Sequence, residues 1–132
     1  MKVLVAEDSS LLRSQIIRTL SDLKGVEVVG ELQDAMEACA AIAELKPDVV
    51  ILDILMRGGK GIEVLKRIKR QDSFMVAIVL THGIAPPYRK RSTEAGAEFF
   101  LDKSTDFQEM RGIIQRLNDQ FNKTCRAVGH DT

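Results

Sequence analysis

The sequence predicts an α/β fold, a doubly wound five-stranded parallel sheet with five helices. Short apolar runs alternate with longer amphipathic segments five times along the chain, and the central runs are apolar at consecutive positions. Consecutive apolar positions are typical of strands that are buried on both faces of a parallel sheet. Five such units in order imply a doubly wound α/β sandwich whose crossovers are right-handed.

Five runs are predicted as strands, and each is followed by a helical pattern. The strands are Val3–Ala6, Val26–Gly30, Val49–Leu52, Val76–Leu80 and Glu98–Leu101. Ser9 or Ser10 is predicted to cap the first helix, and Gly25 to stop it. The buried stripe of that helix is predicted to be Leu12, Ile16, Thr19, Leu20 and Leu23.

The second helix is predicted to start at an Asp34 cap and to end before Pro47. It is predicted to run through Met36, Ala40, Ile42, Ala43 and Leu45. The third helix follows a glycine-rich loop and carries Ile62, Val64, Leu65 and Ile68. Pro86 and Pro87 suit the first turn of a short fourth helix that ends near Gly96.

The fifth helix has the clearest periodicity, with apolar residues at steps of three and four that bury one face. These residues are Phe107, Met110, Ile114, Leu117 and Phe121. Residues 1–121 are therefore predicted to form one domain. The tail Asn122–Thr132 lacks this periodicity and is predicted to be flexible.

Composition and charge exclude several classes of protein. The chain has 132 residues, a common size for one domain, and 19 basic against 19 acidic residues. Zero net charge argues against direct DNA binding by the whole surface. The longest apolar runs are too short to cross a bilayer, and no secretory signal pattern is seen. Cys39 and Cys125 have no metal-ligand spacing, so we expect a cytoplasmic protein with free thiols.

Polar residues follow four of the five predicted strands, at the sheet edge where open parallel sheets bind ligands. Glu7 and Asp8 follow the first strand and Asp53 the third, while Thr81 follows the fourth and Lys103 lies just beyond the fifth. Three carboxylates close together repel one another unless a cation joins them, and an all-oxygen site of this charge selects a hard ion such as Mg²⁺. Each residue by itself also fits a structural role, such as a helix cap or an Asx-turn.

Together the residues support phosphoryl transfer to a carboxylate. Glu7 and Asp8 would hold the ion, while Asp53 would coordinate it through one oxygen and attack phosphorus through the other. Thr81 can donate a hydrogen bond and Lys103 can pair with a phosphoryl oxygen. The product would be an aspartyl-phosphate on Asp53.

The sequence resembles a response-regulator receiver domain of two-component signalling, of the stand-alone chemotaxis-regulator type, over residues 1–121. The matching stretches are VLVAEDS, VVILDILM, IVLTHG and AGAEFFLDKS, and Gly61 stands eight residues after Asp53 as in the family. The resemblance implies a flavodoxin-like sheet of strand order 2-1-3-4-5 and a bacterial, cytoplasmic phosphoprotein.

The resemblance also implies a role for each site residue. Asp53 would be the phosphoacceptor, and the Mg²⁺ ligands would be Glu7, Asp8, Asp53 and the backbone carbonyl of Leu55. Thr81 and Lys103 would contact the phosphoryl group, with the backbone N–H groups of Leu55 and His82 as further donors. Thr81 and Phe100 would form the switch.

Three positions depart from the family pattern. Arg57 and Ser104 stand where proline is frequent, and a non-proline cis bond after Lys103 would cost about 3 kcal/mol. Phe100 stands where tyrosine is common, so a switch that ends in a phenolic hydrogen bond is absent here. None of these departures removes a catalytic group. They therefore concern how the protein responds to phosphorylation, not the phosphorylation itself.

The implied function is that of a phosphorylation-dependent response regulator, which catalyses only its own phosphorylation and dephosphorylation. A histidine kinase or histidine phosphotransfer protein would supply the phosphoryl group. The surface formed by the fourth and fifth strands and the fourth and fifth helices would then change and bind a downstream protein. Dimerisation is also possible through the part of this surface that the fourth helix, the fifth strand and the fifth helix form.

Three other classes of protein share parts of this pattern. A phosphatase or other hydrolase with an aspartyl-phosphate intermediate generally needs a second Asp two residues after the nucleophile, where Leu55 stands. A non-switching adaptor of receiver fold would not need the full set of site residues, and no cofactor loop supports a flavodoxin-like cofactor binder. The segment Met56–Gly61 lacks the spacing of a nucleotide-binding loop. The basic runs 66–70 and 89–91 are predicted as solvated faces, with protein docking as the alternative.

Overall fold

The computed structural model describes residues 1–34, 37–54, 61–72, 74–82, 86–103 and 106–129. For Pro86, Tyr88 and residues 124–129 it describes the backbone alone. In chain order the elements are β1 (Lys2–Ala6), α1 (Ser10–Leu20), β2 (Glu27–Leu32), α2 (Ala38–Leu45), β3 (Val49–Leu52), α3 (Gly61–Gln71), β4 (Val76–Thr81), α4 (Pro86–Glu94), β5 (Phe99–Asp102) and α5 (Phe107–Gly129).

The five strands form one parallel sheet of order β2-β1-β3-β4-β5, which confirms the predicted fold class and strand order. β3 has the predicted bounds. β2 runs to Leu32 rather than Gly30, because it stays paired with β1 as far as Ala6. β5 begins one residue later than predicted, at Phe99, and extends to Asp102 opposite Thr81.

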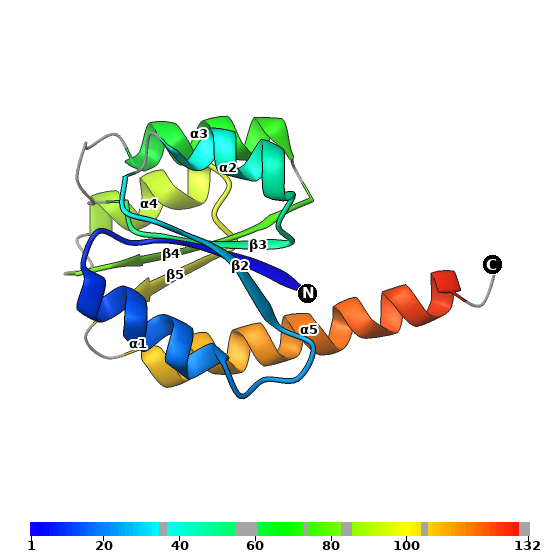
Figure 1. Cartoon of the computed structure of the whole chain (residues 1–132). Helices are drawn as coiled ribbons and strands as arrows, with labels where there is room; N and C mark the ends of the chain where they lie inside the picture. Colours follow the sequence, from blue (N-terminus) through cyan, green and yellow to red (C-terminus); the bar gives the residue numbers. More distant parts are fainter. Residues whose placement is uncertain (35–36, 55–60, 73, 83–85, 104–105, 130–132) are drawn as a thin grey trace.

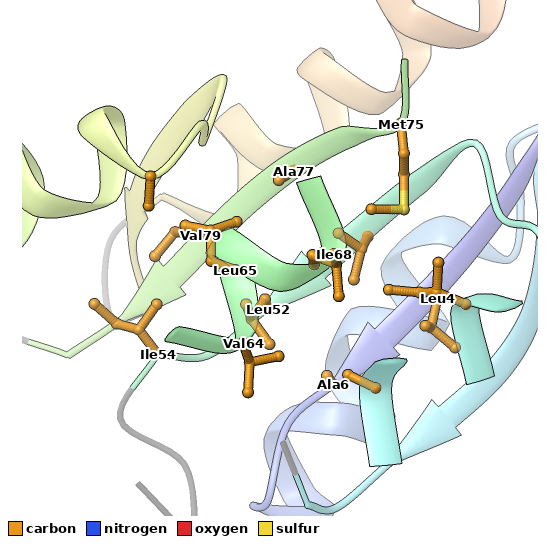
Figure 2. Packing of buried hydrophobic residues seen from close by; sticks show 14 of the residues in the cluster. Leu4, Ala6, Leu52, Ile54, Val64, Leu65, Ile68, Met75, Ala77 and Val79 are labelled. Atoms are coloured by element: carbon orange, nitrogen blue, oxygen red, sulfur yellow. The ribbon is translucent and has the colours of Figure 1, made fainter. Parts of the chain in front are cut away.

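Helices cover both faces of the sheet (Figure 1). α2, α3 and α4 lie on one face, and α1 and α5 lie on the other. Each face has its own apolar core. Figure 2 shows the first, where Leu4, Leu52 and Val79 from the sheet lie beside Leu65 and Ile68 of α3, all buried. The second packs Ile16 and Leu20 of α1 and Met110 and Ile114 of α5 against Val5, Ile51 and Ile78.

α1 begins as predicted but ends earlier. The Ser9 side chain caps the helix by accepting a hydrogen bond from the N–H of Leu12 at 3.3 Å. The helix ends at Leu20, where the N–H of Ser21 donates to the carbonyl of Arg18, so the prediction that Gly25 stops it is wrong. Gly25 instead has a φ of +84° and turns the chain toward β2.

The predicted start of α2 is also wrong. Asp34 lies outside the helix, which runs from Ala38 to Leu45 after Glu37. Among its alanines, Ala38 is buried while Ala40 and Ala43 are exposed. Runs of alanine carry little periodic signal, so the sequence did not distinguish the buried face. Met36 lies outside the described residues, and the helix ends before Pro47 as predicted, with Lys46 at a φ of 49°.

The remaining helices follow the predicted patterns closely. All four predicted apolar residues of α3 are buried. α4 ends at Glu94, and Gly96 follows it with a φ of +110°. Gly61 opens α3 where the backbone of Ile54 passes close by, since a Cβ at this position would lie 2.2 Å from the Ile54 carbonyl oxygen. This close approach accounts for a glycine at position 61.

α5 is longer than predicted. It continues to Gly129, so most of the tail from Asn122 is helical, and in Figure 1 its last turns extend beyond the sheet. The flexibility of this tail stays a prediction. In the part of the chain that the structure describes, no helix is both long and apolar enough to span a membrane.

Candidate functional site

The carboxyl ends of β1 and β3 lie side by side and carry the predicted acids. Ala6 and Leu52 are register partners, so Glu7 and Asp53 each stand one residue beyond a neighbouring strand. The N–H of Asp53 donates to the carbonyl of Ala6 at 3.0 Å, and that of Glu7 donates to the carbonyl of Leu32 at 2.9 Å. β1 lies between β2 and β3, so this is the point where the strand order reverses.

Three carboxylates meet at this point. One oxygen from each of Glu7, Asp8 and Asp53 lies within 4.8 Å of the other two. Glu7 and Asp53 are buried, while Asp8 is half-buried. Oxygen ligands at this separation and of this charge suit a small divalent cation that keeps part of its water shell. The arrangement therefore fits Mg²⁺, with Asp8 at the more accessible side.

Lys103 joins the same cluster from the end of β5. Its ammonium Nζ lies 2.6 Å from Oδ2 of Asp53 and 2.7–2.8 Å from the two oxygens of Glu7. The Lys103 N–H donates to the carbonyl of Thr81 at 3.0 Å, which fixes the start of the side chain beside β4. The Lys103 side chain is 5% exposed. A buried cation thus balances part of the carboxylate charge.

The buried charges shift the pKa values of two groups. Burial raises the pKa of Glu7, and the charge of Asp53 raises it further, while the hydrogen bond from Lys103 opposes the shift. Burial by itself would lower the pKa of Lys103, but its hydrogen bonds to Asp53 and then Glu7 outweigh burial and raise the pKa. Lys103 therefore stays a cation at neutral pH.

Thr81 ends β4 with its side chain fully buried. Its hydroxyl Oγ1 has no hydrogen-bond partner among the described residues. A buried hydroxyl without a partner carries an energetic cost, so Thr81 is ready to bond to a group that arrives at this edge of the sheet.

Phe100, on β5, lies opposite Val79 in the ladder, two residues before Thr81 on β4. Its ring is half-buried and packs against the core on the α3 face. The guanidinium carbon of Arg89, on α4, lies 5.4 Å from the centre of the ring, which is within the range of a cation–π interaction. Arg89 thus links α4 to the predicted switch residue.

One contact of the site was not found from the sequence. Nη1 of Arg13, on α1, donates to the backbone carbonyl of Glu7 at 2.8 Å. The only available signal was the spacing, because Arg13 stands one helical turn after Ser9 and so lies on the same side of α1 as the cap.

Several predicted features lie outside the described residues: the Leu55 carbonyl and N–H, Arg57, most of the Met56–Gly61 segment, and Ser104. His82 is exposed. Most side chains of the two basic runs are exposed as predicted. Lys69 is the exception, because its Nζ contacts a carboxylate oxygen of Glu98 and the carbonyl of Met75, both at 2.5 Å.

The fold and the acidic edge define a doubly wound α/β domain with a candidate cation site, and comparison with known proteins gives its family. Residues 3–115 match the response regulator receiver domain family. The match covers most of the chain, so the protein belongs to this family. Receiver domains of two-component response regulators take phosphoryl groups from histidine kinases or phosphotransfer proteins and bind Mg²⁺ at an acidic pocket.

Two relatives and one solved structure illustrate the similarity. The response regulator GacA of Pseudomonas aeruginosa is 37% identical over 117 residues, which are 88% of this chain and 54% of GacA. A protein-glutamate methylesterase/protein-glutamine glutaminase of Methanospirillum hungatei is 33% identical over 126 residues, 94% of this chain and 37% of that protein. The chain thus spans about half the length of GacA and a smaller share, 37%, of the methylesterase.

The solved structure is the isolated REC domain of RcsB from Salmonella enterica serovar Typhimurium, determined in the presence of the phosphomimetic BeF3⁻. It has a TM-score of 0.78 to this chain at 29% identity and covers 88% of each chain.

Proposed function

We propose that Asp53 is the phosphoacceptor of this receiver domain and that Glu7, Asp8 and Asp53 hold the Mg²⁺ ion. One observation carries the proposal: three carboxylates meet within 4.8 Å at the strand reversal, beside the buried ammonium of Lys103. A purely structural role would not need two buried carboxylates and a third beside them, because three close negative charges oppose one another.

In the transfer step, a carboxylate oxygen of Asp53 attacks the phosphorus of a phosphohistidine. The new O–P bond forms as the N–P bond breaks, and the electron pair of that bond stays on the imidazole of the donor. Bound Mg²⁺ supplies positive charge that offsets the phosphoryl oxygens. Lys103 already lies 2.6 Å from Asp53, so its ammonium can move to a phosphoryl oxygen.

The same phosphoryl group would set the switch. Thr81 has a buried hydroxyl with no partner in the described chain, and a phosphoryl oxygen on Asp53 would provide one. Moving Thr81 toward Asp53 opens space beside β5, which the ring of Phe100 can fill. Burying a phenyl ring is worth about 1.5–3 kcal/mol, enough to shift a two-state surface by tenfold or more.

The output is proposed to be protein binding at the surface of β4, α4, β5 and α5. Phe100 and Arg89 lie on this surface, and Arg89, Lys90 and Arg91 are exposed along α4. The domain would act as a switch, with no chemistry beyond its own phosphorylation and dephosphorylation. Direct DNA binding by these residues is not expected at zero net charge, and we expect the protein to meet its kinase in the cytoplasm.

Intact-mass analysis tests the phosphoacceptor. The wild type and Asp53→Asn are each incubated with acetyl phosphate, with Mg²⁺ or with EDTA. The proposal predicts one added phosphoryl group in the wild type with Mg²⁺, none with EDTA, and none in Asp53→Asn. Asp48→Asn is a matched control, because Asp48 is a half-buried acid at the opposite end of β3 and should label like the wild type. Equal labelling of the wild type and Asp53→Asn would contradict the assignment.

A further inference from the structure

Arg13 is a nearly buried arginine that ties α1 to both strands beside the acidic edge. Its side chain is 12% exposed. Nη1 donates to the Glu7 carbonyl at 2.8 Å, and Nε pairs with Oε1 of Glu31, on β2, at 3.3 Å. The backbone N–H of Arg13 donates to the carbonyl of Ser9 at 2.9 Å, so the residue is itself anchored in the first turn of the helix.

The Glu7 carbonyl belongs to the peptide that leads from Glu7 to Asp8. A peptide unit is planar, so the direction of this carbonyl also sets the positions of the N and Cα atoms of Asp8. The other side of Glu7 is fixed as well, because its N–H donates to the carbonyl of Leu32. Arg13 therefore holds the peptide plane from which the Asp8 side chain projects.

The charge of Arg13 has a carboxylate partner on β2. Glu31, whose side chain is 54% exposed, takes the Nε side of the guanidinium at 3.3 Å and so offsets part of the Arg13 charge. A lone arginine at this place would screen the acids and weaken cation binding. Pairing with Glu31 reduces the effect of the Arg13 charge on the acids, while the hydrogen bond from Arg13 to the Glu7 carbonyl remains.

We propose that Arg13 is a positioning residue for the cation site, which orients Asp8 through the Glu7 carbonyl. The inference rests on the proposed function in that it takes the acidic cluster to be the Mg²⁺ site. Groups that orient metal ligands typically contribute about 10- to 100-fold to metal affinity.

The test is Mg²⁺ affinity by isothermal titration calorimetry on the whole chain, at a temperature where circular dichroism shows each variant folded. Arg13→Gln should bind Mg²⁺ about tenfold more weakly than the wild type. Glu31→Gln keeps the contact with the Glu7 carbonyl and should lose less affinity. Arg111→Gln is the matched control: Arg111 on α5 also pairs with a carboxylate, that of Asp22 at 2.9 Å, and should leave Mg²⁺ affinity unchanged.

Equal affinity of Arg13→Gln and the wild type would overturn the inference, and tighter binding would show instead that Arg13 acts by screening charge. If Arg13→Gln does not fold, Arg13→Lys carries the test, because lysine keeps the charge without the two-point geometry. Affinity that is unchanged in Arg13→Lys would overturn the inference. Absence of Mg²⁺ binding by the wild type would overturn both the inference and the proposed cation site.

Discussion

The acidic edge and the switch face are neighbours, yet their bonding differs. At the acidic edge, Lys103 contacts both Glu7 and Asp53 within 2.8 Å, and these side chains are buried. At the switch face, the Thr81 hydroxyl has no partner in the described chain, and the Phe100 ring is half-buried beneath Arg89. The acidic edge is thus held in place by charge, whereas the switch face has a buried hydroxyl whose hydrogen bond a new group can satisfy.

Lys103→Met should give the largest effect, because it removes the cation from between two buried carboxylates. Removing one partner from a buried ion pair typically costs about 3–5 kcal/mol of folding free energy. We expect a loss near the lower value in urea unfolding with EDTA, since Glu7 can partly relieve the repulsion by protonation: its pKa is already raised by burial and by Asp53.

Lys66→Met is the control for this prediction, because Lys66 is exposed on α3 and its loss should change the unfolding free energy by less than about 0.5 kcal/mol. Similar unfolding free energies for the two variants would show that charge does not hold the acidic edge in place.

The two leading acids should differ in their contribution to Mg²⁺ binding. Asp8→Asn should weaken Mg²⁺ binding more than Glu7→Gln, by about tenfold or more for Asp8. The reason is that the Glu7 carboxylate is buried and engaged by Lys103, while the half-buried Asp8 carboxylate can reach an ion that keeps part of its water shell. Calorimetry suits the measurement because the chain has no Trp to report on the site. The reverse order of losses would exchange the roles of the two acids.

Thr81→Val should give a smaller effect of opposite sign on stability. Valine removes a buried hydroxyl without a described partner, so the unphosphorylated protein should gain about 1 kcal/mol in chemical denaturation. The same change should prevent Phe100 from responding to a phosphate mimic. Thr81→Ser keeps the hydroxyl and should keep the response. A loss of stability in Thr81→Val would mean that the hydroxyl is already bonded in the resting protein.

Much of the fold and site could be predicted from the sequence, since both depend on strong local patterns. Val49–Leu52 is apolar at every position, and its bounds were predicted correctly. Given the strand order, Glu7, Asp53 and Lys103 are expected at the same edge of the sheet, because residues that follow parallel strands share one edge. The comparisons support the family; the individual roles of these residues stay predictions.

The features that were missed depend on tertiary contacts or weak patterns. The alanine-rich α2 gave no clear buried face, and its start at an Asp34 cap was predicted wrongly. The pairing of Lys69 with Glu98 joins residues distant in the chain, which no spacing rule reveals. Arg13 was missed for the same reason, because one partner, Glu7, follows β1 and the other, Glu31, lies on β2.

The most direct measurement of the central claim is NMR of the methyl and aromatic groups with Mg²⁺, before and after beryllofluoride is added. The account predicts that signals of Thr81, Phe100 and the residues of α4 shift together with those beside Asp53, and that Asp53→Asn shows no such shifts. Shifts confined to the residues around Glu7, Asp8 and Asp53, with Phe100 and α4 unchanged, would contradict the coupling between the acidic edge and the switch face.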